Sequence, residues 1–452
     1  MSQFEFDIKG FGAVGDGVAD DTAAIQAALD AGAEQGGGRV VVPAGRYACG
    51  TLFLRDNLEL YLAAGALLKA APHARYNAPE CFPENLATVC GFERADGRHL
   101  IVAYQCRNVA IRGAGGIDGA FAEMAYHGAP IWSRPETRPS QMLFFCRCED
   151  VEVSGITLQN ACYWSLFLFG CRRAVVAGLH VSTDPRGWCC DGIDIDSCQE
   201  VTVRDCVVET EDDCLTLRCD NRRLPAGCDC REITVRDCTL TSAHANAVRV
   251  GVGDGVIRGA RFERLTARGG CGFNVCGRYL PAQAGTEIAD LAFVRSTVTA
   301  RVPFFVTCGC GSRRPAGNLV FADLDFAAAG CGYLGGQPGN PLGPVTFSNV
   351  RLRLGPGEPG ENAWNETGMA GRWQGQEVFY QISDGLPYAL LAEHVRGWEC
   401  RDCSLAMAGT GRRWRAAVRL ANVTESQLRA GLRLELDPAE AVAAPWDETA
   451  ES

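Results

Sequence analysis

The chain has 452 residues, of which 47% are hydrophobic and 21% are charged, a globular composition that excludes a disordered chain. Lys and Arg total 43 against 54 Asp and Glu, a net charge of −11 without any basic stripe, which argues against a nucleic-acid partner. The longest apolar stretch, Leu58 to Leu68, is interrupted by Glu59 and is too short to span a bilayer, so no membrane partner is expected.

The N-terminal segment lacks a basic stretch followed by an apolar core. No signal peptide is therefore expected, which predicts a cytoplasmic location, or a secreted one if a signal was removed. In that setting the 24 cysteines are expected to be buried free thiols that pack as small hydrophobic residues. Cys400 and Cys403 form the one Cys-x-x-Cys pair, with no second pair at zinc spacing, so no metal ion is expected.

Residues 20–35 have the pattern of an amphipathic helix. Asp20 and Asp21 stand at its start, and Gly36 to Gly38 follow its end. Four apolar side chains between them share one face: Ala24, Ile25, Ala28 and Leu29. That face needs a partner surface, which the remainder of the chain must provide.

A unit made of a cysteine, two polar residues and an alternating apolar strand recurs along the chain. It begins at Cys106, Cys148, Cys171, Cys198 and Cys230, and the widest gap, between the first two, spans more than one unit. A period in the twenties with short alternating strands and frequent Gly turns predicts a parallel β-solenoid, whose leading cysteines stack as an internal ladder. No Leu-x-x-Leu-x-Leu pattern recurs, which excludes a leucine-rich repeat, and a propeller blade needs roughly 40 residues or more.

The open ends of a solenoid must be covered, so the helix over 20–35 is expected to cap the N-terminal end. Strand patterns continue at Tyr388–Leu391, Cys403–Met407, Ala416–Leu420 and Leu432–Leu436. The Gly- and Pro-rich residues 354–376 predict a surface loop, and the acidic segment from Pro438 onward predicts a frayed tail. The sequence therefore predicts one all-β domain over residues 1–437, of roughly ten or more coils, and a tail over 438–452.

The most acidic strand starts lie on two successive coils, Asp191-Gly-Ile-Asp-Ile-Asp and Asp212-Asp-Cys-Leu-Thr-Leu-Arg. Aligning the inward isoleucines of the first coil with the inward leucines of the second places Asp191 level with Asp213, one coil later, and Asp212 beside them. In the same register His244 precedes the next alternating strand, and Asn274 stands one coil further on. All five side chains are therefore expected at the same corner of the stack.

Carboxylates gathered in this way raise the pKa of at least one of their number. An acid kept protonated beside ionised carboxylates is what cleavage of a glycosidic bond requires. A solvated acidic face and a calcium site are the alternatives, because Asp is also a common calcium ligand. Spacing alone leaves these three interpretations open.

Several motifs resemble the polygalacturonase family, glycoside hydrolase family 28, over residues 6 to about 300. They are Phe11-Gly-Ala-Val-Gly-Asp-Gly, Asp20-Asp-Thr-Ala-Ala-Ile-Gln, Val41-Val-Pro-Ala-Gly-Arg-Tyr, Gly113-Ala-Gly-Gly-Ile-Asp-Gly, Gly155-Ile-Thr-Leu-Gln-Asn, Asp191-Gly-Ile-Asp and Asp212-Asp-Cys. The last two are the most specific, since pectate-lyase-like and phage tail β-helices share the N-terminal motifs. The resemblance implies a right-handed parallel β-helix of the pectin-lyase-like superfamily.

The resemblance also implies roles for the acidic residues, in a hydrolysis that inverts the anomeric centre. Asp212 resembles the general acid that protonates the leaving oxygen. Asp191 and Asp213 resemble the pair that holds and deprotonates the attacking water. His244 resembles the histidine that tunes the protonation of the acid, and no cofactor is implied.

The chain departs from the family pattern in four motifs. Cys189-Cys190 replaces Asn-Thr before Asp191, Glu211 replaces the Gly before the acidic pair, and Ala replaces both Gly around the histidine. The Arg-x-Lys pair that binds the sugar carboxylate aligns with Asn274-Val-Cys276. The candidate replacements for this carboxylate clamp are the cations Arg218, Arg249 and Arg278. The candidates for stacking on sugar rings are the aromatic residues Tyr163, Trp164 and Tyr279.

The leading hypothesis is an inverting glycoside hydrolase acting on a pectic or related polysaccharide or oligosaccharide. Without the carboxylate clamp, polygalacturonate is expected to be a poor substrate, and in a cytosolic enzyme cleavage at chain ends is favoured over internal cleavage. A β-helix lyase ranks lower, because its chemistry needs calcium and a basic residue, and no Arg or Lys base stands in register. A non-catalytic carbohydrate-binding solenoid is the third alternative, although a structural coil has no use for three clustered carboxylates.

Overall fold

The computed structural model describes residues 4–71, 84, 97–123, 138–278, 284–309, 311–356 and 385–449. The chain divides into two compact units. Unit 1 comprises residues 1–215 and 221–229, and unit 2 comprises residues 216–220 and 230–452. The predicted single domain over 1–437 stays a prediction, and most of the predicted loop, residues 357–376, lies outside the described residues.

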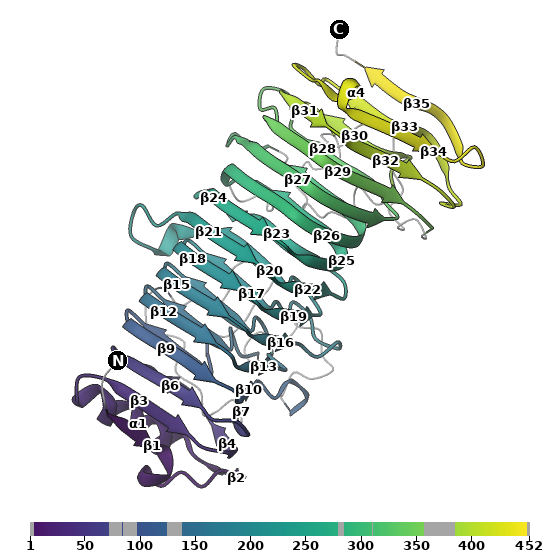
Figure 1. Ribbon diagram of the computed structural model, residues 1–452. Coiled ribbons are helices and arrows are strands. Elements are labelled where there is room, and N and C mark those ends of the chain that lie inside the picture. The colour runs from purple at the N-terminus through teal and green to yellow at the C-terminus, as the bar shows by residue number, and fades with distance from the viewer. Residues whose placement is uncertain are drawn as a thin grey trace. The chain divides into compact units, whose positions relative to one another are not determined.

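Unit 1 is built from three ladders of parallel strands, which Figure 1 shows in purple to teal. The first ladder contains β1 (Glu5–Asp7), β3 (Gly38–Val42), β6 (Leu58–Leu62), β9 (Arg107–Gly113), β12 (Glu149–Ser154), β15 (Arg172–Ala177) and β18 (Gln199–Arg204). The second contains β2 (Asp16–Asp20), β4 (Gly45–Cys49), β7 (Ala66–Ala70), β10 (Gly116–Asp118), β13 (Thr157–Gln159), β16 (His180–Ser182) and β19 (Val207–Thr210). The third contains β5 (Leu52–Phe53), β8 (Ile101–Tyr104), β11 (Leu143–Cys146), β14 (Leu166–Phe169) and β17 (Ile193–Asp196). Strands consecutive in the chain thus fall in different ladders, which is the arrangement of a β-helix.

Unit 2 repeats this arrangement with longer, bent strands. It contains most of β20 (Leu215–Cys219), then β21 (Cys230–Arg236), β22 (Thr239–Ser242), β23 (Asn246–Gly253), β24 (Val256–Glu263), β25 (Thr266–Cys276), β26 (Glu287–Thr307), β27 (Ala316–Ala328), β28 (Gly332–Gly335), β29 (Val345–Leu354), β30 (Tyr388–Glu393), β31 (Trp398–Arg401), β32 (Cys403–Met407), β33 (Arg413–Ala421), the short helix α4 (Leu428–Gly431), β34 (Leu432–Leu436) and β35 (Ala441–Thr449). The start of β25 pairs with β22 and its end pairs with β23, so one strand serves two ladders. Among the described residues of both units, no helix is long and apolar enough to cross a membrane.

The predicted cysteine ladder is present in unit 1. Strand register places Cys106, Cys148, Cys171 and Cys198 on successive coils, and each thiol donates to a backbone carbonyl of the preceding coil. The second residue after each of these cysteines has a left-handed φ, between 52° and 59°, and two of these four residues are Asn and Asp, which tolerate that conformation. The repeat thus encodes a tight turn followed by a strand. The cytoplasmic location, which was inferred from the missing signal-peptide pattern, stays a prediction.

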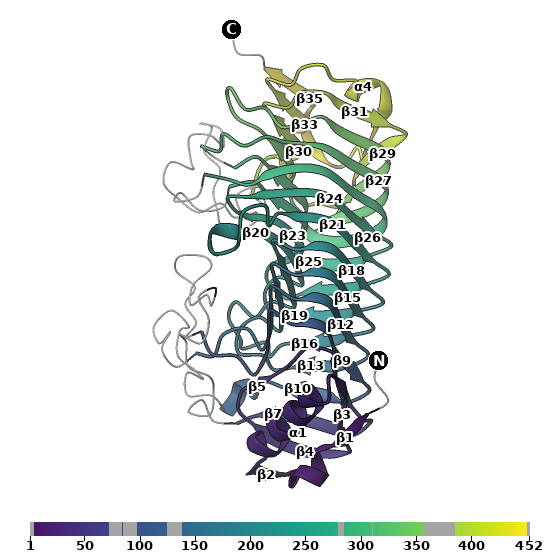
Figure 2. The same ribbon diagram turned by 90° about the vertical axis from the view of Figure 1, so that its left-hand side faces the viewer.

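Helix α1 (Thr22–Glu34) confirms the predicted helix and lies beside β1 and β3 at the start of unit 1 (Figure 2). Its buried positions are Ile25, Ala28, Leu29 and Gly32. A Cβ on Gly32 would lie 2.8 Å from the Leu58 side chain, so glycine lets the helix approach the first coils closely. The apolar face predicted from the sequence therefore covers the N-terminal end of the stack.

Asp21 anchors the turn before α1 rather than capping the helix. Its side chain, 1% exposed, accepts hydrogen bonds from the N–H groups of Val14 (2.5 Å) and Gly15 (3.0 Å). Asp21→Ala is expected to lower the free energy of unfolding by about 1–3 kcal/mol, because two N–H groups lose their acceptor. Urea denaturation measures this, with Asp30→Ala as the control, since Asp30 forms an exposed ion pair with Arg55. Equal losses in the two variants would contradict this role for Asp21.

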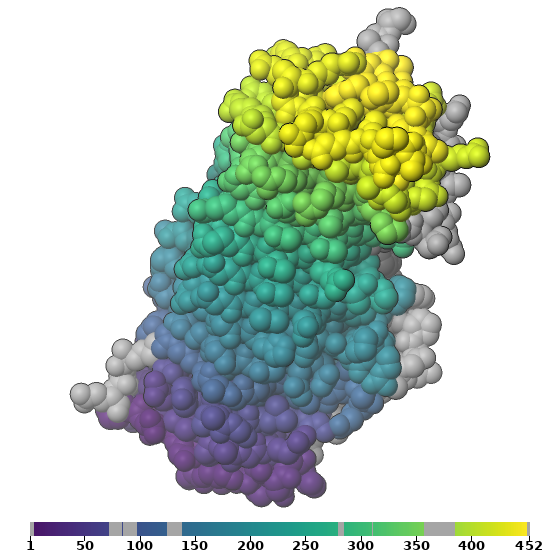
Figure 3. Space-filling view, turned by 45° about the vertical axis from the view of Figure 1, so that its right-hand side comes forward, coloured from purple at the N-terminus to yellow at the C-terminus, as the bar shows by residue number. Residues whose placement is uncertain are grey.

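The acidic C-terminal segment is not the frayed tail that was predicted. Strand β35 pairs in parallel with β33, and its residues lie at the surface of this end of unit 2, in yellow in Figure 3. The acidic side chains that suggested solvation pair with arginines instead. Asp447 lies 2.6 Å from Arg419 and Glu448 lies 2.8 Å from Arg429.

Candidate active site

Asp191 and Asp213 lie level with each other on neighbouring coils of unit 1. The N–H of Gly192 donates to the carbonyl of Asp213 (2.9 Å), and the N–H of Ile193 donates to that of Cys214 (3.0 Å). In a parallel ladder, the residue whose N–H donates is paired with the residue that follows the acceptor. Leu166 shows this one coil earlier, because it is paired with Ile193 and its N–H donates to the carbonyl of Gly192. By the same rule Asp191 is paired with Asp213. The register predicted from the inward isoleucines and leucines is therefore present.

Gly192 is required for this close approach. A Cβ at this position would lie 2.5 Å from the Cys214 carbonyl oxygen and 2.5 Å from the Val208 side chain. The backbone that carries Asp191 is thus pressed directly against the coil that carries Asp213. Ser165 supports it from the other side, because its N–H and its hydroxyl both donate to the Asp191 carbonyl, at 2.9 Å and 3.1 Å.

The three aspartates differ in their access to solvent. Asp191 and Asp213 are buried, at 3% and 1% exposed, whereas Asp212 between β19 and β20 is only half-buried. The hydroxyl of Thr210 donates to the backbone carbonyl of Asp212 (2.7 Å) and so fixes the turn on which Asp212 lies. One carboxyl group is thus more accessible than the other two.

Cysteines flank both aspartate segments without supplying a nucleophile. Burial raises the pKa of the Cys190 thiol and of the Cys214 thiol to about 12, with the charges of Asp213 and Asp212 adding to the effect at Cys214. Both thiols are therefore neutral at physiological pH. Because the thiolate is the reactive form, these cysteines act as small packing residues rather than as catalytic groups.

Glu211 and Arg138 are two buried charged residues next to the aspartates. Glu211 is 8% exposed and Arg138 is completely buried. Burial raises the pKa of Glu211 to about 7, and the charge of Asp213 adds to this, while the N–H groups of Cys190 and Cys189 and the Arg138 cation lower the pKa. Sequence reasoning noted Glu211 only as a departure from the family Gly and missed Arg138. The presence of a charged residue at a position where the family has Gly was the feature of the sequence that could have identified Glu211.

His244 lies in unit 2, on the exposed turn between β22 and β23. The N–H of Ala245 donates to the Ser242 hydroxyl (2.8 Å), which closes this turn. The backbone around His244 is therefore ordered by a local side-chain contact, and its role at the aspartates stays a prediction.

Asn274 is not level with His244 on the neighbouring coil, so the register predicted for these two residues is wrong. Asn246 pairs with Cys271 and Arg249 pairs with Asn274, which places Asn274 further along its strand than the residue level with His244. The coil is therefore shorter at this point than the sequence spacing of His244 and Asn274 suggested. Asn274 is 5% exposed, and its amide donates to the Asn246 side chain (3.0 Å).

Arg249 therefore stands beside the position where the family has its carboxylate clamp. It is 8% exposed, and its charge also reaches Cys276, whose pKa burial raises to about 12. Arg218 is 1% exposed, which leaves its guanidinium little access to a polysaccharide in solution. Arg278 is half-buried and lies against Gly309 and Gly311, and a Cβ on Gly311 would lie 2.3 Å from Nη1. Of these three cations, Arg249 is the one in register with Asn274.

Two of the three aromatic candidates for sugar stacking are inside the coil. Tyr163 is 1% exposed and Trp164 is completely buried, and their rings stack on each other with centroids 4.6 Å apart. Tyr279 lies outside the described residues. Trp188, which sequence reasoning did not single out, is 50% exposed and lies shortly before Asp191 in the chain.

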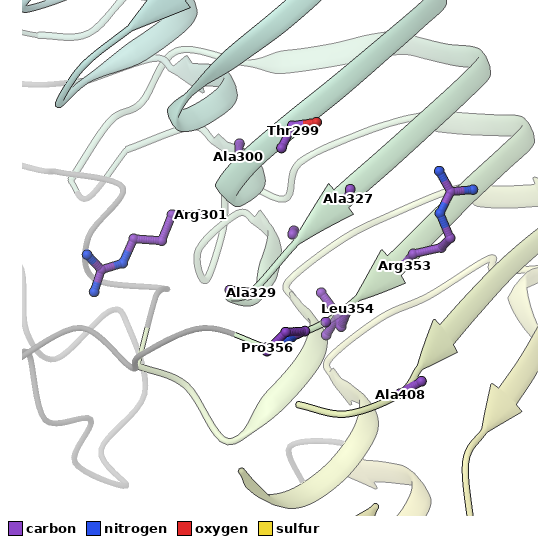
Figure 4. Close-up of a pocket in the computed structure, with 11 residues that line it drawn as sticks. Thr299, Ala300, Arg301, Ala327, Ala329, Arg353, Leu354, Pro356 and Ala408 are labelled. Carbon is purple, nitrogen blue, oxygen red and sulfur yellow. The ribbon is translucent and has the colours of Figure 1, made fainter. Parts of the chain in front are cut away.

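Two hollows of the described surface lie elsewhere. One, of about 670 Å³, lies in unit 2 between Thr299–Arg301 within β26 and the ends of β27 and β29, where Arg301 and Arg353 extend in opposite directions (Figure 4). Arg353 is also paired with Asp325 (2.8 Å). The other, of about 650 Å³, lies in unit 1 beside Phe53 and Tyr104. Neither has converging charges, and within the described ranges no three His, Cys, Asp or Glu side chains are arranged to hold a metal ion.

Known families match two parts of the chain. Residues 86–244 match glycosyl hydrolases family 28, and residues 6–61 match the family described as rhamnogalacturonase A/epimerase, pectate lyase-like. The first match contains all three aspartates and His244.

A curated relative named "Probable polygalacturonase", from Vitis vinifera, is 29% identical over 217 residues. That alignment covers 46% of this chain and 43% of the relative, so the chain spans less than half of the relative's length. A shorter segment of 43 residues is 63% identical to a mannuronan C5-epimerase of Azotobacter vinelandii, over 10% of this chain and 4% of that protein.

Among solved structures, a hyperthermoactive exopolygalacturonase from Thermotoga maritima superposes with a TM-score of 0.58 at 19% identity. The superposition covers 78% of this chain and 88% of that chain, which establishes the fold. The predicted fold and the resemblance are thus confirmed: the chain has the right-handed parallel β-helix fold, and its residues 86–244 match glycosyl hydrolases family 28.

Proposed function

We propose that the protein is an inverting glycoside hydrolase of the polygalacturonase type, acting on a pectic or related polysaccharide or oligosaccharide. One observation carries the proposal. Asp191 and Asp213 lie level on neighbouring coils, and the half-buried Asp212 immediately precedes Asp213 in the chain. All three aspartates lie inside the region that matches a glycoside hydrolase family. A structural coil gains nothing from carboxylates gathered in this way, because like charges repel.

In this proposal Asp212 is the general acid, since it is the most accessible of the three aspartates and the one that a glycosidic oxygen reaches most easily. Asp191 and Asp213 hold and deprotonate the water that attacks from the opposite face of the sugar. Inverting enzymes separate the acid from the base by about 6.5–9.5 Å, which leaves room for that water. His244 keeps the tuning role that the resemblance implies.

The substrate class follows from the altered clamp. A galacturonate carboxylate needs a cationic partner, ideally a bidentate Arg, whereas Asn274 and Cys276 offer only neutral groups. We therefore expect polygalacturonate to be turned over more slowly than a glycan with a neutral galactosyl, rhamnosyl or xylosyl unit at this position. Arg249, in register with Asn274, is the cation that would hold whatever uronate the site accepts.

A panel of pectic oligosaccharides and aryl glycosides with product analysis tests the proposed function. Hydrolysis gives new reducing ends without unsaturated sugars, and a chelator leaves the rate unchanged. Unsaturated products that absorb in the ultraviolet, formed only with calcium, would identify a lyase instead. Binding without cleavage across the whole panel would identify a carbohydrate-binding solenoid.

Arg249→Ala is expected to lower kcat/KM on polygalacturonate by about 10- to 100-fold, while activity on a neutral glycan changes little. The reason is the loss of a charge-assisted hydrogen bond to the sugar carboxylate, worth about 1.5–3 kcal/mol. Arg258→Ala is the matched control, because Arg258 is exposed and pairs with Glu287 (2.8 Å). Polygalacturonate turnover as fast as that of any neutral glycan, unchanged by Arg249→Ala and Arg278→Ala, would contradict the inferred specificity.

A further inference from the structure

The segment that leads into Asp191 is held by a completely buried arginine. Arg138 donates from Nε to the carbonyl of Cys162 (3.0 Å), and from Nη2 to the carbonyls of Trp188 (2.7 Å) and Cys189 (3.3 Å). Its guanidinium lies 4.1 Å from the centre of the Tyr163 ring. Arg138 therefore ties the backbone just before Asp191 to the preceding coil.

Glu211 holds the same segment from the following coil. Its N–H donates to the Thr183 hydroxyl (2.8 Å), which fixes the start of the turn that carries Asp212 and Asp213. Because Asp191 is level with Asp213, Cys189 is level with Glu211 on the neighbouring coil, and the N–H groups of Cys190 and Cys189 are close enough to the Glu211 carboxyl group to lower its pKa. Cys189 thus lies between Arg138, which donates to its carbonyl, and Glu211, which is level with it on the following coil.

Cys189 lies at a turn whose backbone is left-handed. Its φ is 53°, in the left-handed region that residues other than Gly, Asn and Asp rarely adopt. Turn residues of the coils such as Arg173 and Glu200 share this conformation, which surrounding contacts hold in place. The two side chains next to Cys189, those of Arg138 and Glu211, can do so because both are more than nine-tenths buried.

Each of the two charged side chains keeps one buried polar atom without a hydrogen-bond partner among the described residues, Nη1 of Arg138 and Oε2 of Glu211. No ion pair between the two is present, although the Arg138 cation is close enough to lower the pKa of Glu211. A buried guanidinium and a buried carboxyl group without a direct ion pair are costly to stability. Their retention therefore fits a role in holding the site better than a role in holding the fold.

We propose that Glu211 is a positioning residue for Asp191, which together with Arg138 fixes Cys189 and so sets where the Asp191 carboxylate lies relative to Asp212 and Asp213. This inference rests on the proposed hydrolase function and deepens it. The family pattern has Gly at position 211. Glu211 therefore gives this chain a side chain between two coils where the family has a flexible backbone without one. A base displaced by about 1 Å loses up to about 100-fold in rate.

The test compares Glu211→Ala, Glu211→Gln and the control Glu209→Gln, with kcat, KM and urea denaturation measured for each. Glu209 lies on the same segment, in β19, and pairs with the exposed His180. Glu211→Ala is expected to lower kcat by about 10- to 100-fold with KM unchanged. Glu211→Gln keeps an oxygen acceptor for the Cys190 N–H and is expected to recover most of kcat, and Glu209→Gln is expected to match the wild type.

A merely structural role would lower stability and activity together, and Gln would not restore the rate. Glu211→Ala with unchanged kcat, or Glu211→Gln as slow as Glu211→Ala, would overturn the positioning role while the proposed function stands. If the wild type cleaves no glycan, the proposed function fails, and amide hydrogen exchange decides the positioning role by itself. Faster exchange at Cys189 and Cys190 in Glu211→Ala than in Glu209→Gln supports it, and equal exchange overturns it.

Discussion

Asp212→Asn is expected to lower kcat by about 10²–10⁴-fold, the usual contribution of general acid catalysis. Asn has the same shape as Asp but has no proton to give to the leaving oxygen. Folding is expected to be unaffected, because the turn is fixed by the Thr210 hydroxyl bonding to the backbone carbonyl of Asp212, which the substitution leaves in place. Steady-state kinetics and urea denaturation of the same preparation measure both quantities.

Asp205→Asn is the matched control for Asp212→Asn. It makes the same change in charge, and Asp205 forms a partly exposed ion pair with Arg204 (2.6 Å). Its φ of 56° is also a conformation that Asn tolerates well. Near-wild-type kcat in Asp212→Asn, or an equal loss in both variants, would remove Asp212 from the role of acid.

Glu211 is expected to make the protein less stable as the pH rises toward neutrality. Burial raises its pKa from the ordinary 4.5 to about 7, so between these values the unfolded chain has released its proton while the folded chain still holds it. The free energy of unfolding therefore falls as the pH rises from 4.5 to about 7, by up to about 3 kcal/mol. Below pH 4.5 and above pH 7, Glu211 adds no further slope.

Glu211→Gln removes this ionisation and is expected to remove the matching part of the slope. Urea denaturation of wild type, Glu211→Gln and Glu209→Gln between pH 4 and about 8 measures the difference. Glu211→Gln should exceed the wild type in stability above pH 7, while Glu209→Gln follows the wild-type curve. Parallel curves for wild type and Glu211→Gln would show that Glu211 ionises normally in the folded protein.

The sequence was sufficient where a residue type repeats at a position that each coil buries. The ladder of Cys106, Cys148, Cys171 and Cys198 could be predicted because every coil places its turn against the one below. The register of Asp191 with Asp213 could be predicted for the same reason, since a slip by one residue would turn the inward isoleucines toward solvent.

The sequence was insufficient to place residues where the length of a coil changes or where the contacts are distant in the chain. Asn274 was misplaced because β25 bends through two ladders, which shortens the coil between it and β23. The tail was misjudged because Asp447 and Glu448 pair with arginines that are distant in sequence. Arg138 was missed since its contacts reach backbone carbonyls of two other coils, and no local pattern records such contacts.

The central claim is that this aspartate site hydrolyses a glycosidic bond with inversion. The most direct test is proton NMR of the anomeric signals during hydrolysis of a substrate of known configuration, recorded before the product mutarotates. The first-formed product is expected to have the opposite anomeric configuration to the substrate. A first-formed product that retains the substrate's configuration would contradict the claim.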